Sequence, residues 1–522
     1  MRHAASTHVP KGARWRPGEH RFAALHRPGA TVAVRLEMPD PGWDPCDLSE
    51  ALPVHVPVYL FETAGGPPDL ERRTFLAWDP EREFVLRRGD LEVRAGGEVV
   101  RRLRTRQPLE YLRRVLEAES AGAASGIHPM GFSGGLVGWL SYDFKNYLER
   151  LPDTARDDLE LPELRFGLVR RVVVWDRRRR EMSLRFSLKC SDDVRADLQR
   201  ARRTLLDLYA ALQTAATRRK PARKATPAGP LRSNVSRAAY DDMLARAHEH
   251  IMAGDVYQAN LSHRFEARFA GRGIDLYRRL RAINPSPFAC WLRFPEYEIV
   301  SCSPERLVKV ERGRVETRPI AGTHPRGMDV ASDKRLHREL RVDTKERAEH
   351  LMIVDMARND IGRVCEAGSV AVERFMHAEG YSHVRHLVTN VVGKLRPDRD
   401  AFDVLAATFP GASITGVPKV RCMQIIDALE RVRRGVYTGS AGYIGFDGSM
   451  DFNILIRTFL LQDGRAYFHV GGGIVADSDS EREFQETLSK GRALAEALGS
   501  VHRAARGRTW APEPRPRRTA SS

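Results

Sequence analysis

Two glutamates three residues apart, Glu346 and Glu349, lie in the segment DTKERAEHLMIVDMARNDIG, residues 343–362. The segment predicts a helix, because Asp343 can cap its first turn and Glu346 then stands at the third helical position, as in a capping box. Residues three apart share one helix face. The two carboxylates could therefore hold a cation together, or they could be the solvated acids of a capped helix.

A second helix with spaced charges is predicted over residues 478–498, SDSEREFQETLSKGRALAEAL. Glu483, Glu486 and Lys490 stand at i, i+3 and i+7, which places them on one stripe. One interpretation is a simple salt bridge between Glu486 and Lys490, which stabilises a helix only weakly. The other is that the two acidic helices face each other and hold Mg²⁺, which needs only one or two protein carboxylates besides water and substrate oxygens.

Three further features could bind an anion or move a proton. The run HVGGGIVADS (469–478) precedes the second acidic helix, and its glycines let backbone N–H groups approach an anion, although a tight turn is the alternative. Arg457 in FNILIRTFLL is predicted within an apolar strand, where it forms a buried ion pair or binds a carboxylate in a cleft. His386 in VRHLVTNVVGKL is also predicted in an apolar strand, where a lone histidine is more often a core residue than a catalyst.

The composition is that of a globular protein, with 522 residues, 42% hydrophobic and 29% charged. The net charge of +17 is concentrated in residues 1–30, 217–233 and 501–522, which hold +5, +6 and +5 and leave +1 for the rest. A nucleic-acid enzyme is expected to have a basic groove on its folded body, so we expect no specific nucleic-acid partner. No window is apolar enough to span a membrane, and the six scattered cysteines suggest reduced thiols in a cytoplasmic protein.

The order of the predicted elements, strand-rich with long helices inserted, favours an α+β fold with antiparallel sheet. We expect five segments: a basic, disordered extension over 1–45, an N-terminal domain over 46–216, a basic linker over 217–233, a catalytic domain over 234–498 and a basic tail over 499–522.

The stretch ETRPIAGTHPRG, residues 316–327, has two prolines, two glycines and no apolar periodicity. Such a segment suits neither a regular helix nor a central strand. We expect an irregular connector whose backbone passes close to the substrate.

Nine segments, in order between residues 236 and 498, resemble the chorismate-utilising enzymes. This family includes the component I subunits of anthranilate synthase and of 4-amino-4-deoxychorismate (aminodeoxychorismate) synthase, with isochorismate and salicylate synthases as cousins. The N-terminal part matches more loosely, through VYLFETAGGPPDLERRTFLAWDP and GGLVGWLSYDF. The nine segments are GDVYQANLSHRF, NPSPFACWLRF, SCSPERLVKV, ETRPIAGTHPRG, KERAEHLMIVDMARNDIGRV, FPGASITGVPKVRCMQIIDALE, YTGSAGYIGFDG, IRTFLL and GGGIVADSDSEREFQETLSK.

The resemblance implies a two-domain, sandwich-like core of antiparallel β-sheet with surrounding helices, and chorismate as substrate. It implies that Mg²⁺ is held by Glu349 and Glu486, with Glu346 and Glu483 as supporting acids. Glu305 in SPER would be the general acid for the hydroxyl that leaves C4, and His386 would lie near the reacting ring. The groups that contact substrate would be Tyr437, Arg457, Gly472, Gly473, Lys490, Ala321, Gly322 and Thr323.

Gln258, in VYQAN, bears on whether water or ammonia is the nucleophile of the reaction. The isochorismate and salicylate synthases have a lysine there that activates water, and glutamine cannot act as a base, so the resemblance implies ammonia addition. None of the six cysteines lies in a glycine-rich elbow, so we expect the ammonia to come from a separate glutamine amidotransferase subunit.

Two amination products remain. VYQANLSHRF and GASITGVPK resemble the aminodeoxychorismate synthases of folate biosynthesis, which is our first hypothesis. Anthranilate synthase, of tryptophan biosynthesis, is the alternative, because PIAGT places Ala321 where many aminodeoxychorismate synthases have a lysine. NPSPF is also close to the tryptophan-site motif of anthranilate synthases, although Thr63 in LFET replaces the serine expected there. A non-catalytic relative is a third possibility, which the complete set of charged residues disfavours.

Overall fold

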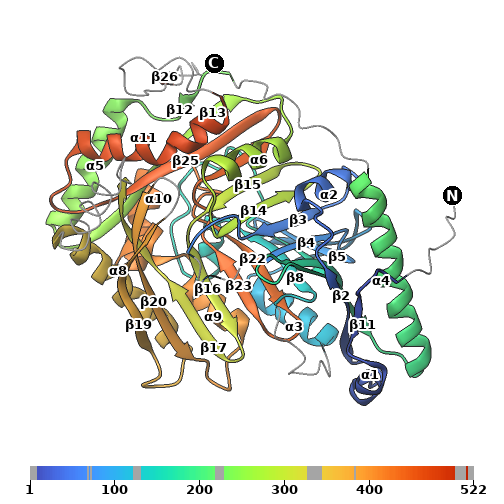
Figure 1. Cartoon of the computed structure of the whole chain (residues 1–522). Coiled ribbons are helices and arrows are strands. Elements are labelled where there is room, and N and C mark those ends of the chain that lie inside the picture. Colours follow the sequence, from blue (N-terminus) through green and yellow to red (C-terminus); the bar gives the residue numbers. More distant parts are fainter. Residues whose placement is uncertain are drawn as a thin grey trace.

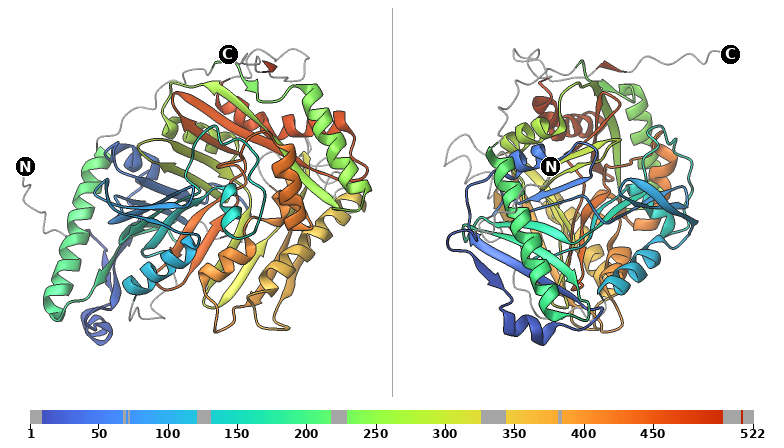
Figure 2. Two further views of the ribbon diagram at one scale, coloured as in Figure 1. Left: turned by 180° about the vertical axis from the view of Figure 1, so that it is seen from behind. Right: turned by 90° about the vertical axis from the view of Figure 1, so that its right-hand side faces the viewer.

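The computed structural model describes residues 9–67, 70, 73–120, 131–217, 229–325, 344–380, 384–499 and 513–514, although the side chains of 321–325, 344–345, 380, 384–386 and 513–514 are not described. Within this part, two large sheets of 14 and 12 strands are antiparallel except for one short pairing, between β12 and β26. Helices lie on their outer faces (Figures 1 and 2). The predicted α+β class with antiparallel sheet is confirmed.

The larger sheet contains strands from both ends of the chain. Its order is β1 (Arg14–Arg16), β2 (Thr31–Pro39), β11 (Glu181–Lys189), β10 (Arg171–Asp176), β4 (Arg73–Trp78), β3 (Val58–Glu62), β14 (Phe288–Arg293), β15 (Glu298–Ser303), β24 (Thr458–Gln462), β25 (Arg465–Ile474), β13 (Gln258–Arg268), β12 (Arg232–Ser233) and β26 (Glu513–Pro514), with β21 (Gly416–Val417) beside β13.

The smaller sheet also combines strands from both halves of the chain. Its order is β18 (Ile320–Pro325), β20 (Val384–Lys394), β17 (Arg314–Arg318), β16 (Arg306–Glu311), β23 (Met450–Asn453), β22 (Ser440–Gly445), β8 (Gly135–Leu140), β9 (Leu164–Val169), β5 (Arg82–Arg87), β6 (Asp90–Ala95) and β7 (Glu98–Arg104), with β19 (Ala371–Gly380) beside β20.

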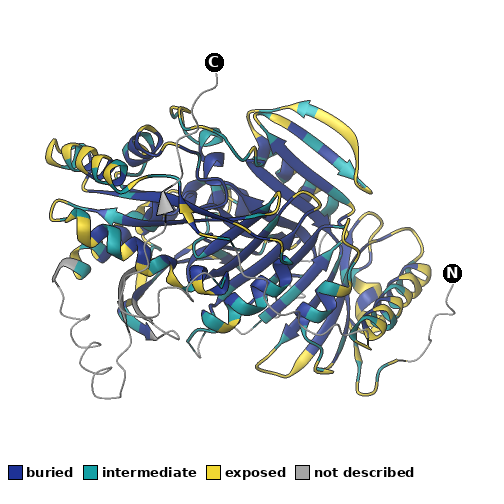
Figure 3. Ribbon diagram, turned by 90° about the horizontal axis from the view of Figure 1, so that it is seen from above, coloured by how far each residue is buried: buried dark blue, intermediate teal, exposed yellow. Residues whose placement is uncertain are grey.

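The helices cover these sheets, and Figure 3 shows buried strands in the interior with exposed helix faces at the rim. Helices α11 and α5 pack on β25 and β13, α8 packs on β18 and β20, and α4 runs along β11 and β2. The bounds are α1 (Glu19–Leu25), α2 (Pro45–Ala51), α3 (Pro108–Ser120), α4 (Val194–Thr217), α5 (Arg237–Met252), α6 (Gly273–Ile283), α8 (Thr344–Gly362), α9 (Ala401–Thr408), α10 (Lys419–Leu429) and α11 (Ser480–Ala497), with 3₁₀ turns at Tyr142–Tyr147 and Ala412–Ile414.

The segments before and after the linker share both sheets. Strand β3 pairs with β14 in the larger sheet, and β8 pairs with β22 in the smaller one. A core cluster between the sheets combines Leu292 and Leu460 from the larger with Val137 and Ala441 from the smaller. Residues 218–228 of the linker and most of the tail lie outside the described residues.

Residues 14–39, which we expected to belong to a disordered extension, form β1, α1 and β2. Strand β2 pairs with β11 along its whole length, and Phe22, Val32, Val34 and Leu36 are buried. The basic residues of the region obscured an apolar alternation, TVAVRLEM, which is a strand signal.

The stretch 316–327 is more regular than we expected, up to the last described residue at 325. It forms the end of β17 and all of β18, which run in line along β20 and are interrupted at Pro319. The register shifts between Ala321 and Thr323, so Gly322 lies at a bulge. The prolines and glycines therefore interrupt a strand without abolishing it.

Candidate active site

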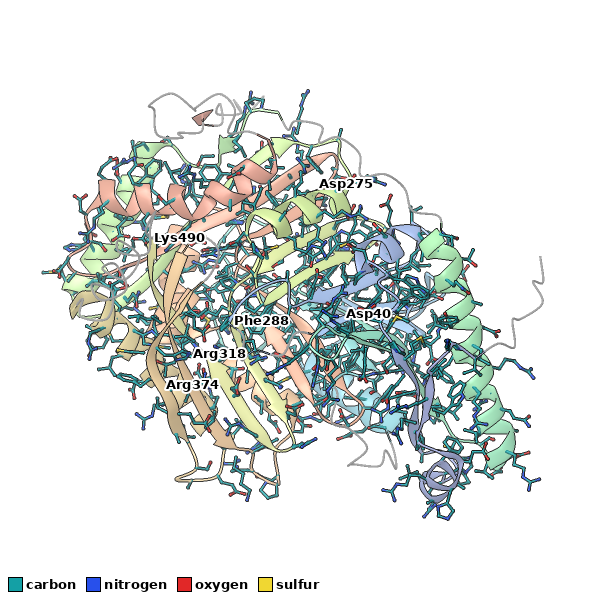
Figure 4. The ribbon with its side chains drawn as sticks, viewed as in Figure 1. Asp40, Asp275, Phe288, Arg318, Arg374 and Lys490 are labelled. Atoms are coloured by element: carbon teal, nitrogen blue, oxygen red, sulfur yellow. The ribbon has the colours of Figure 1, made fainter. Side chains whose placement is uncertain are left out.

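A cleft of about 400 Å³ is lined by residues of α8, α11 and the paired strands β13 and β25. Figure 1 shows these elements on its left side. Figure 4 labels Lys490 on α11, at this side of the molecule. The cleft brings together most of the residues predicted from sequence: Gln258, Glu305, Glu346, Glu349, Tyr437, Arg457, Gly473, Glu483, Glu486 and Lys490.

Glu305 is the buried acid of the cleft, placed by the turn between β15 and β16. Its side chain is only 4% exposed. Oε1 accepts hydrogen bonds from Ser413 Oγ at 2.7 Å and from the backbone N–H of Ile320 at 3.3 Å. Burial raises the pKa of Glu305 to about 7, against the opposing effects of these two donors and of Arg457. Near neutral pH this carboxyl can therefore give or take a proton.

Helix α11 brings Glu483, Glu486 and Lys490 to the cleft. It begins at Asp479, whose side chain accepts a hydrogen bond from the backbone N–H of Arg482. Glu483 is buried and accepts from Ser478 Oγ at 2.8 Å. Lys490 Nζ lies 2.8 Å from Glu486 Oε1 and also donates to a glycine carbonyl of β25 at 3.2 Å.

Helix α8 brings Glu346 and Glu349 to the same cleft. It is fixed to β20 by fully buried His350, whose Nε2 lies 2.6 Å from Thr389 Oγ1. Asp343, the predicted cap, lies outside the described residues.

The four glutamates provide the oxygen donors that Mg²⁺ prefers. In the part of the chain that the structure describes, no three of their carboxylates lie within 4.8 Å of one another. The donor set fits a cation that is held by one or two carboxylates and completed by water and substrate. Lys490 also pairs with one of these acids, so the cleft can offer both charge signs to a substrate.

The glycines of β25 keep the cleft open. A Cβ at Gly473 would lie 2.0 Å from Gln258 Nε2, and one at Gly471 would lie 2.8 Å from the Tyr437 hydroxyl. A Cβ at Gly472 would meet nothing closer than 3.5 Å. Glycine is needed sterically at Gly471, where an added Cβ would also lie 2.5 Å from the Leu261 carbonyl oxygen, whereas a Cβ at Gly473 would require the Gln258 side chain to move.

Arg457 does not lie inside a strand, contrary to prediction. It ends the irregular link between β23 and β24, with a φ of +53°, an uncommon conformation for a residue with a side chain. Its Nη1 donates to Asn284 Oδ1 at 3.2 Å, and it lines the cleft. The apolar neighbours suggested a continuous strand, but the chain turns here and presents the guanidinium to the cleft wall.

Some predicted residues cannot be placed at the level of side chains. His386, Ala321 and Thr323 are described only by their backbone, and so is Gly322 at the bulge. Thr323 pairs with His386 across β18 and β20. Their predicted roles therefore stay predictions.

Comparisons with known proteins identify the family of this chain. The model of a family described as chorismate binding enzyme matches residues 57–496. The chain belongs to this family. The resemblance noted in the sequence is thereby confirmed, and we refer to the chain below as this chorismate-binding enzyme.

Its relatives include both kinds of component I. Anthranilate synthase component 1 of Aquifex aeolicus (strain VF5) is 44% identical over 70% of this chain and 74% of its own length. Aminodeoxychorismate synthase component 1 of Bacillus subtilis (strain 168) is 40% identical over 70% and 77%. The crystal structure of anthranilate synthase component I from Streptococcus pneumoniae TIGR4 superposes with a TM-score of 0.72, at 33% identity over 83% of this chain and 93% of that chain.

Sequence reasoning missed several residues of the cleft wall, among them Asn260, Ser413 and His469. Alternation along β25 could have found His469, because it lies four residues before the predicted Gly473 and so shares its face of the strand. No local signal pointed to Ser413, which reaches Glu305 only through the fold.

A second cavity, of about 90 Å³, lies apart from the cleft and is lined by aromatic side chains. It brings together Thr63 of LFET and Phe288 of NPSPF, the segments compared above with the tryptophan site of anthranilate synthases, from which Thr63 departs. Phe288 lies near the centre of Figure 4, away from Lys490. The other lining side chains include Phe61, Phe75, Phe132, Tyr443, Glu62, Arg73, Arg306 and Asp451.

Among the residues described, no helix combines the length and the apolar character needed to cross a membrane.

Proposed function

We propose that this chorismate-binding enzyme adds ammonia to chorismate, with Glu305 as the acid. The observation that carries the proposal is the buried carboxyl of Glu305, which shares a cleft with the cations Arg457 and Lys490. Its pKa of about 7 keeps a substantial protonated fraction at neutral pH. A general acid is most effective when its pKa lies near the working pH.

The cleft suits a substrate that is a dianion. Arg457 and Lys490 can each bind a carboxylate, and Tyr437 and the N–H groups of Gly472 and Gly473 can add neutral donors. Glu349 and Glu486 would hold Mg²⁺, with Glu346 and Glu483 in support. When bound, the cation offsets the charge of the ring carboxylate and polarises the ring.

Each proton that Glu305 gives away in the proposed reaction is returned to it. Glu305 gives its proton to the hydroxyl at C4, the C4–O bond breaks and water leaves. Ammonia supplies the electron pair of the new C–N bond, and its surplus proton restores the acid. Gln258, beside Gly473, has no basic group, which supports ammonia over water as the nucleophile.

The ammonia would come from a glutamine amidotransferase subunit. Such an enzyme needs an accessible nucleophilic cysteine, whereas all six cysteines of this chain are buried. The relatives' names, with "component 1", also point to a second component.

For the product, our first candidate is 4-amino-4-deoxychorismate. The two segments that resemble aminodeoxychorismate synthases contribute Asn260 and Ser413 to the cleft, and Ser413 bonds directly to the acid Glu305. The position of these two residues in the cleft supports this candidate.

Anthranilate is the second candidate. It is favoured by Ala321, which stands where many aminodeoxychorismate synthases have a lysine. Several further relatives are also named anthranilate synthase component 1. The cavity around Thr63 and Phe288 also supports this alternative.

A single assay separates the candidates. The enzyme is incubated with chorismate, Mg²⁺ and ammonium at alkaline pH, where free ammonia is plentiful. A product that becomes 4-aminobenzoate only after a lyase is added supports the first candidate, whereas fluorescent anthranilate without a lyase replaces it with the second. No turnover while Mg²⁺ binding is measurable would indicate a non-catalytic relative.

A further inference from the structure

Two buried polar atoms of the cleft wall, His469 Nε2 and Asn260 Oδ1, have no hydrogen-bond partner among the described residues. The side chain of His469 is only 7% exposed, and its Nε2 is buried without a hydrogen bond to any described residue. Buried polar atoms in native proteins are almost always paired, so an orphan in a substrate cleft suggests a place for a ligand atom.

The position of His469 relates it to the predicted carboxylate-binding segment. It lies on β25 two and four residues before Gly471 and Gly473, so all three share the face of the strand that lines the cleft. Its ring stacks on that of Tyr437, with centroids 5.1 Å apart and planes 15° from parallel. The stack fixes the imidazole beside a predicted substrate-binding hydroxyl.

The surroundings hold this imidazole neutral. Burial lowers the pKa of His469 well below its usual value, and Arg264 and Arg434 lower it further. A neutral imidazole still offers one N–H donor. It can therefore bind an anion through a hydrogen bond without bringing a full charge into a buried site.

We propose that His469 is a substrate-binding residue that donates a hydrogen bond to the chorismate carboxylate bound at Gly473, with which it shares a face of β25. The inference rests on the proposed function, since it takes chorismate as the substrate. It adds a neutral donor to Arg457, Lys490 and Tyr437, and assigns the stacked pair of rings to recognition of one carboxylate.

Two substitutions separate hydrogen bonding from ring packing. His469→Phe keeps a flat ring to stack on Tyr437 but removes the donor, whereas His469→Gln keeps a neutral N–H and gives up the ring. For the Phe variant we expect KM for chorismate to rise about tenfold, the usual effect of one hydrogen bond to a charged group, with kcat and KM for ammonium within about threefold of wild type. The Gln variant should stay within about threefold in all three constants.

The affinity for chorismate is also measured by calorimetry with Mg²⁺ and without ammonia, so the result does not depend on which product forms. Thermal unfolding shows whether both variants are folded. The inference is overturned if the Phe variant binds chorismate like wild type, if the Gln variant is impaired as much as the Phe variant, or if KM rises for ammonium and not for chorismate. A wild-type enzyme that neither binds nor converts chorismate would overturn the proposed function and this inference with it, whereas an active wild type with an unaffected Phe variant overturns this inference alone.

Discussion

At the scale of single residues, burial determines the chemistry of Glu305. Desolvation disfavours its charged form, while Ser413, the Ile320 N–H and Arg457 favour that form, and the pKa settles at about 7. The acid is therefore tuned by the low polarity around it. Such tuning affects both activity and stability, because the protein must hold a carboxyl that water would ionise.

Replacing Glu305 by glutamine should lower kcat by about 10²–10⁴-fold, the usual contribution of a general acid. The amide oxygen can still accept from Ser413 and Ile320, so the variant should fold. Steady-state kinetics with chorismate and ammonium measures the effect, and a variant that keeps wild-type kcat would exclude Glu305 as the acid.

The same substitution should change the pH dependence of stability. Because the folded pKa of Glu305 is raised, its contribution is fully present below about pH 4.5, and ionisation of the unfolded chain removes it progressively as the pH rises to about 7. The loss is on the order of 3 kcal/mol. The free energy of unfolding of Glu305→Gln relative to wild type should therefore increase from pH 5 to pH 8, as measured by urea unfolding. A relative stability that does not change with pH would contradict a raised pKa.

Glu486→Ala should abolish Mg²⁺-dependent turnover while leaving the protein folded, because it removes a predicted metal ligand. Glu481→Ala is the matched control on the same helix, since its exposed carboxylate binds Arg237 at the surface. Titration of activity and of calorimetric heat with Mg²⁺ tests both. Full activity in the Glu486 variant would remove this residue from the metal site.

At the scale of elements, one continuous stretch supplies much of the cleft. Strand β25 brings its glycines against β13, the chain turns at residues 475–479, and α11 returns with Glu483, Glu486 and Lys490. Helix α8 approaches from the smaller sheet, with His350 bonded to Thr389. Each acidic helix is therefore packed on a different sheet, and the two line one cleft.

Gly473→Ala should disturb the cleft and leave the fold largely intact. The added Cβ would lie 2.0 Å from Gln258 Nε2, so the glutamine side chain must move. We expect kcat/KM for chorismate to fall at least about tenfold, with a modest change in melting temperature. Gly362→Ala, where the added Cβ meets nothing within 4 Å, is the control and should retain normal kinetics. Equal kinetics for the two variants would show that Gln258 adjusts freely.

At the scale of the whole molecule, neither half of the chain has a sheet of its own. The pairs β3–β14 and β8–β22 join segments far apart in sequence, and the cluster around Val137 and Leu460 fills the space between the sheets. The halves therefore depend on each other for backbone hydrogen bonds and for apolar burial.

Residues 1–217 and 229–522, expressed separately, should each fail to fold, because each exposes strand edges and apolar faces that the other half covers. Co-expressed, the two pieces should associate and restore ammonium-dependent turnover. Circular dichroism and size-exclusion chromatography test this. A folded, monomeric N-terminal piece would show instead that residues 1–217 form an independent domain.

Sequence alone determined the local chemistry. The spacing of Glu346 with Glu349 and of Glu483 with Glu486 specified which carboxylates share a helix face, since helix geometry is periodic. The ordered motifs specified the family and its chorismate-binding character. The same local reasoning was wrong at Arg457, which lies outside a strand, and at residues 316–325, which form strands. A proline, glycine or charge shows where regular structure is interrupted, but not which structure follows.

Only the tertiary structure decided how these residues act together. The cleft unites residues from β13, β25, α8, α11 and the turn around Glu305, and no short-range pattern encodes which elements become neighbours. It also decided that Ser413 bonds to Glu305 and that His469 is buried against Tyr437, with a ring nitrogen that has no hydrogen bond among the described residues. Burial and hydrogen-bond partners set acidity and binding, and both depend on contacts between residues distant in sequence.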